Sequence, residues 1–138
     1  MNYRDAMEDD AARIVEIANE YVLDENLSVE SMNDLIQDRT VKVAEEEGDD
    51  ANEIRGYISY QATRGKVMVQ HLGVVPDYRD EVTAQLLENA TRYADDHDMA
   101  TRIAVEENSW CIPILERHGF EHVGNESFKD EELVVYER

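Results

Sequence analysis

The chain has 138 residues, which is enough for one domain that buries about 65–70% of its unfolded surface without a disulfide or a structural metal. Its 33 acidic and 13 basic residues give a formal net charge of −20, and such a charge repels phosphate backbones and anionic lipid headgroups. The longest apolar runs, such as Val67-Met68-Val69, fall far short of the roughly 20 residues that a membrane-spanning helix needs. We therefore expect a single domain over residues 1–138, with neither a nucleic-acid nor a membrane partner.

The N-terminal region and the cysteine content restrict the cellular location and the metal chemistry. Residues 1–20 carry acidic side chains where a signal peptide would be apolar, so we expect a cytoplasmic protein. Cys111 is the only cysteine, which excludes an internal disulfide and any metal site built from several thiolates. We expect no structural metal.

Apolar spacing in the first half of the chain predicts two helices followed by a hairpin. Over residues 8–22 apolar side chains recur every three or four positions, as on one stripe of a helix. A shorter helix is predicted over Val29–Gln37, with Ser28 as its N-cap. Two strands, Val41–Glu47 and Ile54–Thr63, follow around a charged turn. We expect one face of the second strand to hold Ile54, Ile58, Tyr60 and Ala62.

The second half predicts a central strand, a long helix and then shorter elements. Residues Lys66–Val75 carry apolar side chains on both faces, which is typical of a central strand, and Pro76 ends it. The elements that follow are a helix over 79–97, a strand over Thr101–Val105, a helix capped by Asn108 that ends at His118-Gly119, and strands over Phe120–Gly124 and Glu132–Tyr136. The predicted order is β-α-α-β-β-β-α-β-α-β-β, an α/β fold with one mixed sheet and helices on both faces.

One predicted connection locates a ligand site. The central strand, the 79–97 helix and the 101–105 strand form a crossover between parallel strands, which is normally right-handed. In open sheets of this kind a ligand binds at the carboxyl end of the strands. We therefore expect the site at Leu72–Arg79.

Two motifs in this order resemble a known family. One is Leu72-Gly73-Val74-Val75-Pro76-Asp77-Tyr78-Arg79 before an amphipathic helix, and the other is Asn108 followed by Glu116-Arg117-His118-Gly119-Phe120. Together with the element order, they resemble the GCN5-related N-acetyltransferase (GNAT) superfamily over nearly the whole chain. The resemblance implies an acetyl-CoA-dependent N-acetyltransferase, whose acceptor is an amine of a small molecule or of a protein.

The resemblance also implies which residues bind acetyl-CoA. The pyrophosphate turn of the family is Q/R-x-x-G-x-G/A, and the six positions here are Arg79, Asp80, Glu81, Val82, Thr83 and Ala84. A helix N-terminus suits a pyrophosphate because its first amides are unpaired and carry partial positive charge. Val82 replaces the central glycine, where its side chain can crowd a phosphate. Asp80 and Glu81 either oppose the phosphates or only stabilise the helix dipole. Further cofactor contacts are implied for Leu72, Gly73, Val74 and Asn108, and Asn108 is equally explained as a plain N-cap.

Acetyl transfer to an amine needs a base and an oxyanion donor. The donor in the family is a backbone N–H, here near Leu72–Val74, and the position of the family's tyrosine acid holds Leu115. His71 is the leading candidate for the base because it lies on the central strand and titrates near neutral pH, with Gln70 and Glu106 behind it. A core histidine is the competing explanation. Three tyrosines either line an acceptor groove or pack on the sheet: Tyr57, Tyr60 and Tyr78.

Other interpretations stay open. A GNAT-fold CoA-binding or regulatory module that has lost catalysis would also carry Val82 and Leu115 at the motif positions. An acidic interaction protein unrelated to CoA, or a DNA mimic, would concentrate its charge on one side. Acidic residues are instead spread over every segment, and ten of the 13 basic residues are arginines, a pattern that resembles proteins of salt-loving archaea. We expect a haloarchaeal-type acidic protein, and a homodimer is left open.

Overall fold

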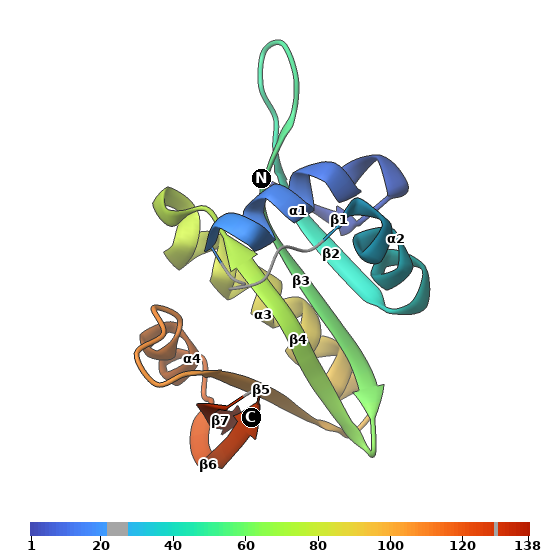
Figure 1. Ribbon diagram of the computed structural model, residues 1–138. Helices are drawn as coiled ribbons and strands as arrows, with labels where there is room; N and C mark the ends of the chain where they lie inside the picture. Colours follow the sequence, from blue (N-terminus) through green and yellow to red (C-terminus); the bar gives the residue numbers. More distant parts are fainter. Residues whose placement is uncertain (22–27, 129) are drawn as a thin grey trace.

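The computed structural model describes residues 1–21, 28–128 and 130–138, which form a seven-stranded sheet with the order β1-β2-β3-β4-β5-β7-β6 (Figure 1). Neighbouring strands are antiparallel except β4 and β5, which are parallel. In chain order the elements are β1 (Asn2–Asp5), η1 (Glu8–Asp10), α1 (Ala11–Tyr21), α2 (Val29–Asp38), β2 (Thr40–Glu46), β3 (Glu53–Thr63), β4 (Lys66–Val74), η2 (Pro76–Tyr78), α3 (Arg79–Asp96), β5 (Ala100–Glu106), α4 (Ile112–Arg117), β6 (Glu121–Phe128) and β7 (Glu131–Glu137). The predicted order of helices and strands is confirmed, and two short 3-10 helices, η1 and η2, are added.

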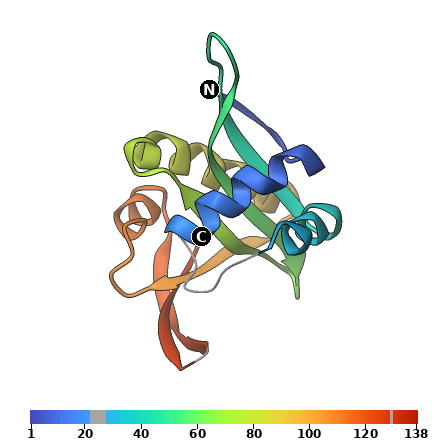
Figure 2. The ribbon, with the colours of Figure 1, turned by 45° about the horizontal axis from the view of Figure 1, so that its top comes forward.

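Helices cover both faces of the sheet, as predicted (Figure 1). α1 and α2 pack on what we call the front face, over a core that includes Ile14, Met32 and Val43. α3 and α4 pack on the opposite, back face, over a larger core that includes Leu86 and Leu115. The connection between β2 and β3 projects beyond both layers (Figure 2). These two cores define which side chains of the central strands point forward and which point back.

The first two helices begin where the sequence predicts. The Oγ of Ser28 accepts a hydrogen bond from the backbone N–H of Ser31 at 3.1 Å, which confirms Ser28 as the N-cap of α2. The segment predicted as a helix from residue 8 starts as η1 and continues as α1 to Tyr21. Its last predicted residue, Val22, lies outside the described residues.

A β-bulge in β3 overturns one predicted face. The pairing of β2 with β3 shifts between Ala44 and Glu45, which leaves Arg55 as an extra residue on β3. Because side chains alternate along a strand, one extra residue reverses the faces on one side of the bulge. Ile54 therefore belongs to the front core and Ile58 to the back core. The prediction that these two side chains share a face is wrong.

The helix α4 starts later than predicted. Asn108 is exposed in the turn that follows β5, and the helix begins at Ile112 with Cys111 as its N-cap. Pro113 lies in the first turn of the helix, where its missing N–H costs no helical hydrogen bond. The prediction of Asn108 as the N-cap is therefore wrong. The predicted end is confirmed, because Gly119 adopts a φ of +87° just after the last turn.

The parallel strands β4 and β5 separate after a short paired stretch. They pair only over Lys66–Val69 and Ala100–Ile103. Beyond it, β4 continues to Val74 along β3, and β5 continues to Glu106 along β7. Figure 1 shows the two strands diverging. Within the described ranges, the facing edges of both strands therefore have no strand partner beyond this point, and we call the gap between them the opening.

Within residues 1–21, 28–128 and 130–138, no helix is long and apolar enough to cross a membrane. No group of three His, Cys, Asp or Glu side chains in these ranges is placed to hold a metal ion. Cys111 is a buried free thiol, and burial raises its pKa, which keeps it protonated.

Candidate active site

A second β-bulge shapes β4 where it leaves β5. The pairing of β4 with β3 shifts by one residue after Val69, so Gln70 is an extra residue on β4. Val69 and Leu72 point into the back core. The side chain of His71 points to the front face instead, where its ring lies 6.4 Å from the ring of Tyr57, a member of the front core. The bulge therefore brings the predicted base to the front of the opening.

Buried polar groups without hydrogen-bond partners gather around His71. Ser59 is paired with His71 across the strands, and Tyr57 is two residues away on the same face of β3. In the part of the chain that the structure describes, no partner exists for the Nδ1 of His71, the Oγ of Ser59 or the Oη of Tyr57. A buried polar group without a partner costs about 1–3 kcal/mol. Three of them together are typical of a site that receives a polar ligand or water.

The surroundings of His71 favour its neutral form. Burial lowers the pKa of His71 below its ordinary value, and the positive charge of Arg39 lowers it further. The imidazole is therefore uncharged at pH 7, in the form that accepts a proton. Burial raises the pKa of Tyr57, so its hydroxyl stays protonated and can donate a hydrogen bond. The site thus pairs a proton acceptor with a hydrogen-bond donor.

The two other candidates for the base lie in different surroundings. Gln70 is the bulged residue and is exposed, and a carboxamide takes up no proton at neutral pH. Glu106 is exposed at the end of β5, on the far side of the opening from β4. Neither belongs to the buried group around His71.

The turn that leads from β4 into α3 is a 3-10 helix. The amide of Tyr78 donates to the carbonyl of Val75 at 3.0 Å, and the amide of Arg79 donates to the carbonyl of Pro76. An anion at this helix N-terminus would therefore use amides after Arg79. The side chain of Asp80 is 87% exposed, so it points into solvent and not across these amides.

Val82, at the position of the family's central glycine, fills the back core. It is fully buried, and a Cβ added to Gly56 would lie 3.0 Å from its Cγ1. The absent side chain of Gly56 therefore makes the room that Val82 occupies. Thr83 is also fully buried. The Val82 side chain, which the sequence suggests could crowd a phosphate, points to the sheet instead, so both residues would meet a ligand through their backbone.

Arg79 and Tyr78 attach the same turn to its neighbours. The guanidinium of Arg79 lies 4.4 Å from the centre of the Trp110 ring, in a cation–π contact. The hydroxyl of Tyr78 donates to the carboxylate of Glu46 at 2.9 Å, and the guanidinium of Arg55 lies over the Tyr78 ring. Tyr78 therefore fixes the turn to the β2–β3 hairpin. Arg79 leaves a positive charge at the start of α3.

The remaining predicted cofactor residues lie along the opening. Leu72, Gly73 and Val74 form the end of β4 and are buried, so they offer a ligand their backbone only. Asn108 is exposed just after β5. Leu115, at the family's tyrosine position, is fully buried in the back core and donates no proton.

Three residues of this region are not among the sequence predictions. The role of Gly56 could have been predicted from the sequence, since a glycine inside a strand often marks a close approach of another group. The roles of Ser59 and Arg39 could not, because they depend on which strand lies beside each residue. Ser59 matters only through its pairing with His71, and Arg39 only through its charge near that ring.

Comparison with known proteins relates nearly the whole chain to one family. Residues 5–135 match the acetyltransferase (GNAT) domain family. No curated protein matches the chain. Among solved structures, an N-acetyltransferase from Staphylococcus aureus Mu50 has 16% identity and a TM-score of 0.81, with 99% of this chain and 96% of that chain covered.

Two further structures were solved with CoA ligands. The yncA protein from Salmonella typhimurium, with its cofactor acetyl-CoA, has 18% identity and a TM-score of 0.78 over 99% of this chain and 92% of that chain. Arabidopsis thaliana Naa50, in complex with the bisubstrate analogue CoA-Ac-MVNAL, has 16% identity and a TM-score of 0.75 over 99% and 97%. At these identities the likeness shows a common fold. Because the family model matches nearly the whole sequence, this chain belongs to the acetyltransferase (GNAT) domain family.

Proposed function

We propose that this chain, as one domain, is an acetyl-CoA-dependent N-acetyltransferase in which His71 takes the proton of the amine acceptor. The observation that carries the proposal is the half-buried histidine on the front face of the opening, whose buried Nδ1 lies beside two buried hydroxyls, all three without hydrogen-bond partners in the described residues. Family membership supports acetyl transfer. The acetyl-CoA bound to yncA and the CoA-peptide analogue bound to Naa50 support the cofactor.

The opening suits the extended arm of acetyl-CoA. The facing edges of β4 and β5 lack strand partners in the described ranges, so their backbone groups are available to an amide-containing chain. The backbone of Leu72–Val74 would bind this arm and provide the oxyanion donor. The amides after Arg79, up to Ala84, would bind the pyrophosphate, with the Arg79 charge offsetting Asp80 and Glu81. Asn108 would contact the arm from the end of β5.

The direction of approach follows from the packing. Acetyl-CoA, when bound, supplies a thioester whose acetyl group passes to the amine nitrogen while the thiolate leaves. The back of the opening is closed by α3 and α4, so the amine reaches it from the front, where His71 lies. The neutral imidazole accepts the ammonium proton, and Tyr57 donates a hydrogen bond beside it. Leu115, in the family's tyrosine position, has no proton to donate, so solvent would supply the proton of the departing thiolate.

The test compares His71→Gln with the parent protein. We expect amine-dependent thiol release to lose about 100-fold in kcat/KM while CoA affinity stays unchanged, because only proton transfer is removed. The parent's kcat/KM should follow an ionisation below about 6.5, the ordinary histidine value. His118→Gln, at an exposed histidine after α4, is the matched control and should retain full activity. A folded His71→Gln protein with parental turnover would refute the role of His71.

The same measurements separate catalysis from cofactor binding alone. CoA binding without amine-dependent thiol release, for any primary amine, would favour the CoA-binding or regulatory module. Absence of CoA binding would refute both. Calorimetry with CoA and a thiol assay with acetyl-CoA give these two results independently.

The proposal also includes the location of the protein, which is a cytoplasm of high salt concentration. The acidic surface suits a salt-rich cytoplasm, because screening at molar salt reduces the repulsion between carboxylates. Eight of the described basic residues already form ion pairs with carboxylates. With 33 acidic and 13 basic residues in the chain, carboxylates outnumber cations, and the excess negative charge is self-repulsive.

A further inference from the structure

Among the residues that the structure describes, Arg39 has no carboxylate partner, although the protein is strongly acidic. It ends α2, where its amide donates to the carbonyl of Leu35 at 2.9 Å, and its side chain is half-buried. Eight other basic residues form ion pairs, but none that involves Arg39 is present among residues 1–21, 28–128 and 130–138. With 33 acidic residues in the chain, such isolation of a half-buried cation calls for a reason.

Arg39 lies on the face that carries His71. Its backbone is extended, with φ −136° and ψ 168°, and it precedes Val41 of the front core by two residues. Since side chains alternate along an extended chain, Arg39 points to the front. After burial, the charge of Arg39 is the second cause that lowers the pKa of His71, which places the two groups within electrostatic reach.

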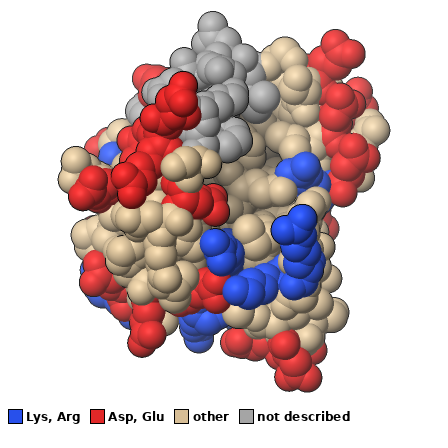
Figure 3. Space-filling model, turned by 60° about the horizontal axis from the view of Figure 1, so that its bottom comes forward, with Lys and Arg blue, Asp and Glu red and all other residues tan. Residues whose placement is uncertain are grey.

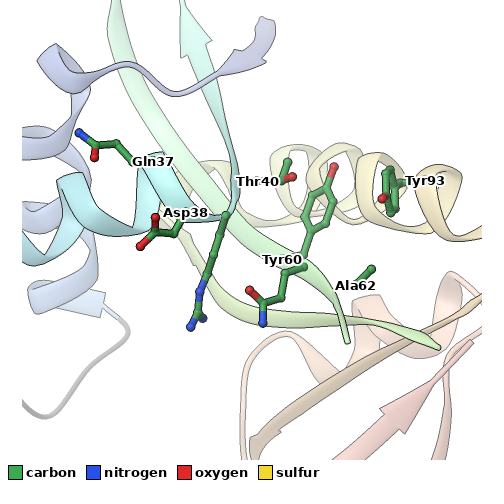
Figure 4. Close-up of a pocket in the computed structure, with 8 residues that line it drawn as sticks. Gln37, Asp38, Thr40, Tyr60, Ala62 and Tyr93 are labelled. Carbon is green, nitrogen blue, oxygen red and sulfur yellow. The ribbon is translucent and has the colours of Figure 1, made fainter. Parts of the chain in front are cut away.

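A polar cavity of about 210 Å³ adjoins Arg39 (Figure 4). Its wall has a front-face part, with Arg39 and Gln61, and a back-face part that includes Tyr60 of the back core and Tyr93 of α3. Asp38 also lines it, exposed and without an ion pair to Arg39 in the described residues. The cavity is large enough for a small polar group and far too small for a protein domain.

Gln61, on the front side of this cavity, lies at a distance from His71 that suits a short acceptor. Gln61 is two residues beyond Ser59, the partner of His71, on the same face of β3. Two residues of a strand span about 7 Å. The flexible side chain of Arg39 can reach toward His71 and reduce this distance. The remaining gap between the guanidinium and the imidazole fits an acceptor whose amine and carboxylate are a few bonds apart.

Electrostatics also require a local cation for such an acceptor. A net charge of −20 repels any anion that approaches. On the face in Figure 3, basic side chains gather in the middle and acidic ones surround them. Lys66 and Arg102, on neighbouring strands below the opening, are both bound to Glu137, at 2.7 and 3.0 Å. Arg39, on the front side, forms no ion pair with any carboxylate of the described ranges.

We propose that Arg39 binds a carboxylate of the acceptor, so that the enzyme acetylates small amino acids in preference to amines without an anionic group. This inference rests on the proposed acetyl transfer. Arginine suits this role because its planar guanidinium binds a carboxylate through two parallel N–H···O bonds. The amine nitrogen would then lie toward His71 and the opening.

The experiment uses four amino acids of increasing length, each compared with its primary amide. Glycine, β-alanine, γ-aminobutyrate and 5-aminopentanoate are assayed with saturating acetyl-CoA at one fixed KCl concentration. We expect kcat/KM for the best amino acid to exceed that of its amide by about tenfold or more. Arg39→Gln should abolish this preference by raising KM for the amino acid, with little change for the amide. Arg39→Lys should restore part of it.

Arg64→Gln is the matched control, since Arg64 also lacks an ion pair in the described residues but is exposed at the β3–β4 turn. This variant should keep the preference for the amino acid.

If the parent protein acetylates the amides and the amino acids equally well, the inference about Arg39 is overturned and acetyl transfer stays intact. If no amine is acetylated, acetyl transfer itself fails. Calorimetry then compares N-acetyl-γ-aminobutyrate with its amide on the CoA-loaded protein, and equal or absent binding overturns the role of Arg39.

Discussion

The contact between Gly56 and Val82 gives a prediction about both packing and the cofactor turn. Val82 Cγ1 lies 3.0 Å from the position of a Cβ on Gly56, and the carbonyl oxygen of Gly73 and Cγ2 of Val74 lie at 3.0 and 3.1 Å. These distances are shorter than ordinary van der Waals contact. The β3 glycine and the α3 valine therefore fit each other, and a change at one should alter the cost of a change at the other.

The magnitudes follow from buried volume. Val82→Ala removes two buried methylene equivalents, worth about 0.8 kcal/mol each, and leaves a cavity, while alanine favours the helix by about 0.5 kcal/mol. We expect a loss of about 2 kcal/mol in the free energy of unfolding. Gly56→Ala should cost about 1–3 kcal/mol through overpacking. In the double variant the new methyl group enters part of the vacated space, so its cost should be about 1–2 kcal/mol below the sum.

Urea unfolding of the four proteins, followed by circular dichroism at fixed KCl concentration, measures this coupling. Effects that add to within about 0.5 kcal/mol would refute the proposed fit. Val82→Gly, which restores the family's glycine, should cost about 3 kcal/mol or more, because a helical glycine adds about 1 kcal/mol. CoA affinity should be the same for Val82→Ala and the parent, since the side chain is fully buried. Tighter CoA binding by the alanine variant would show that the valine does oppose the cofactor.

Three further predictions concern salt and pH. The unfolding temperature should rise between about 0.1 M and about 2 M KCl, as the Debye length falls from about 10 Å toward 3 Å or less, and a flat or falling profile would contradict salt adaptation. Hydrogen bonds from Arg4 hold the pKa values of Asp10 and Glu45 below their usual range. The stability they add is therefore present above about pH 4 and is lost as the pH falls through the lowered values, so urea unfolding of Arg4→Met and the parent should converge in acid. His71 has a lowered pKa, so stability should decline as the pH falls below about 6.5, and this decline should be smaller in His71→Gln.

The elements with long regular patterns were predictable from sequence. The α3 helix has apolar residues at helical spacing from Val82 to Ala94, and β4 has apolar residues on both faces, so the limits of both are predicted nearly correctly. The start of α4 was missed although a signal existed. Pro113 favours the first turn of a helix, which points to a start near Ile112 and not at Asn108.

The bulges could not be predicted, and they decide the site. Arg55 and Gln70 are extra residues only with respect to the pairing with the neighbouring strand. The sequence of one strand alone therefore does not predict the bulge. His71 was selected for its chemistry and its place on the central strand. Its front-facing orientation comes from the bulge at Gln70, and strict alternation from Val69 would have sent it into the back core.

Departures of side chains from the family motif need not remove cofactor binding. A backbone amide is present at every residue except proline, so a site built from amides tolerates changes of side chain that keep the backbone path. Val82 keeps that path because Gly56 makes room for its side chain behind the helix. A side-chain acid has no such substitute, so with Leu115 at that position the proposed acetyl transfer would depend on the thiolate as a leaving group. Strongly basic amines would then be acetylated faster than weakly basic ones. The difference in rate would be larger the more the departure of the thiolate limits the overall rate.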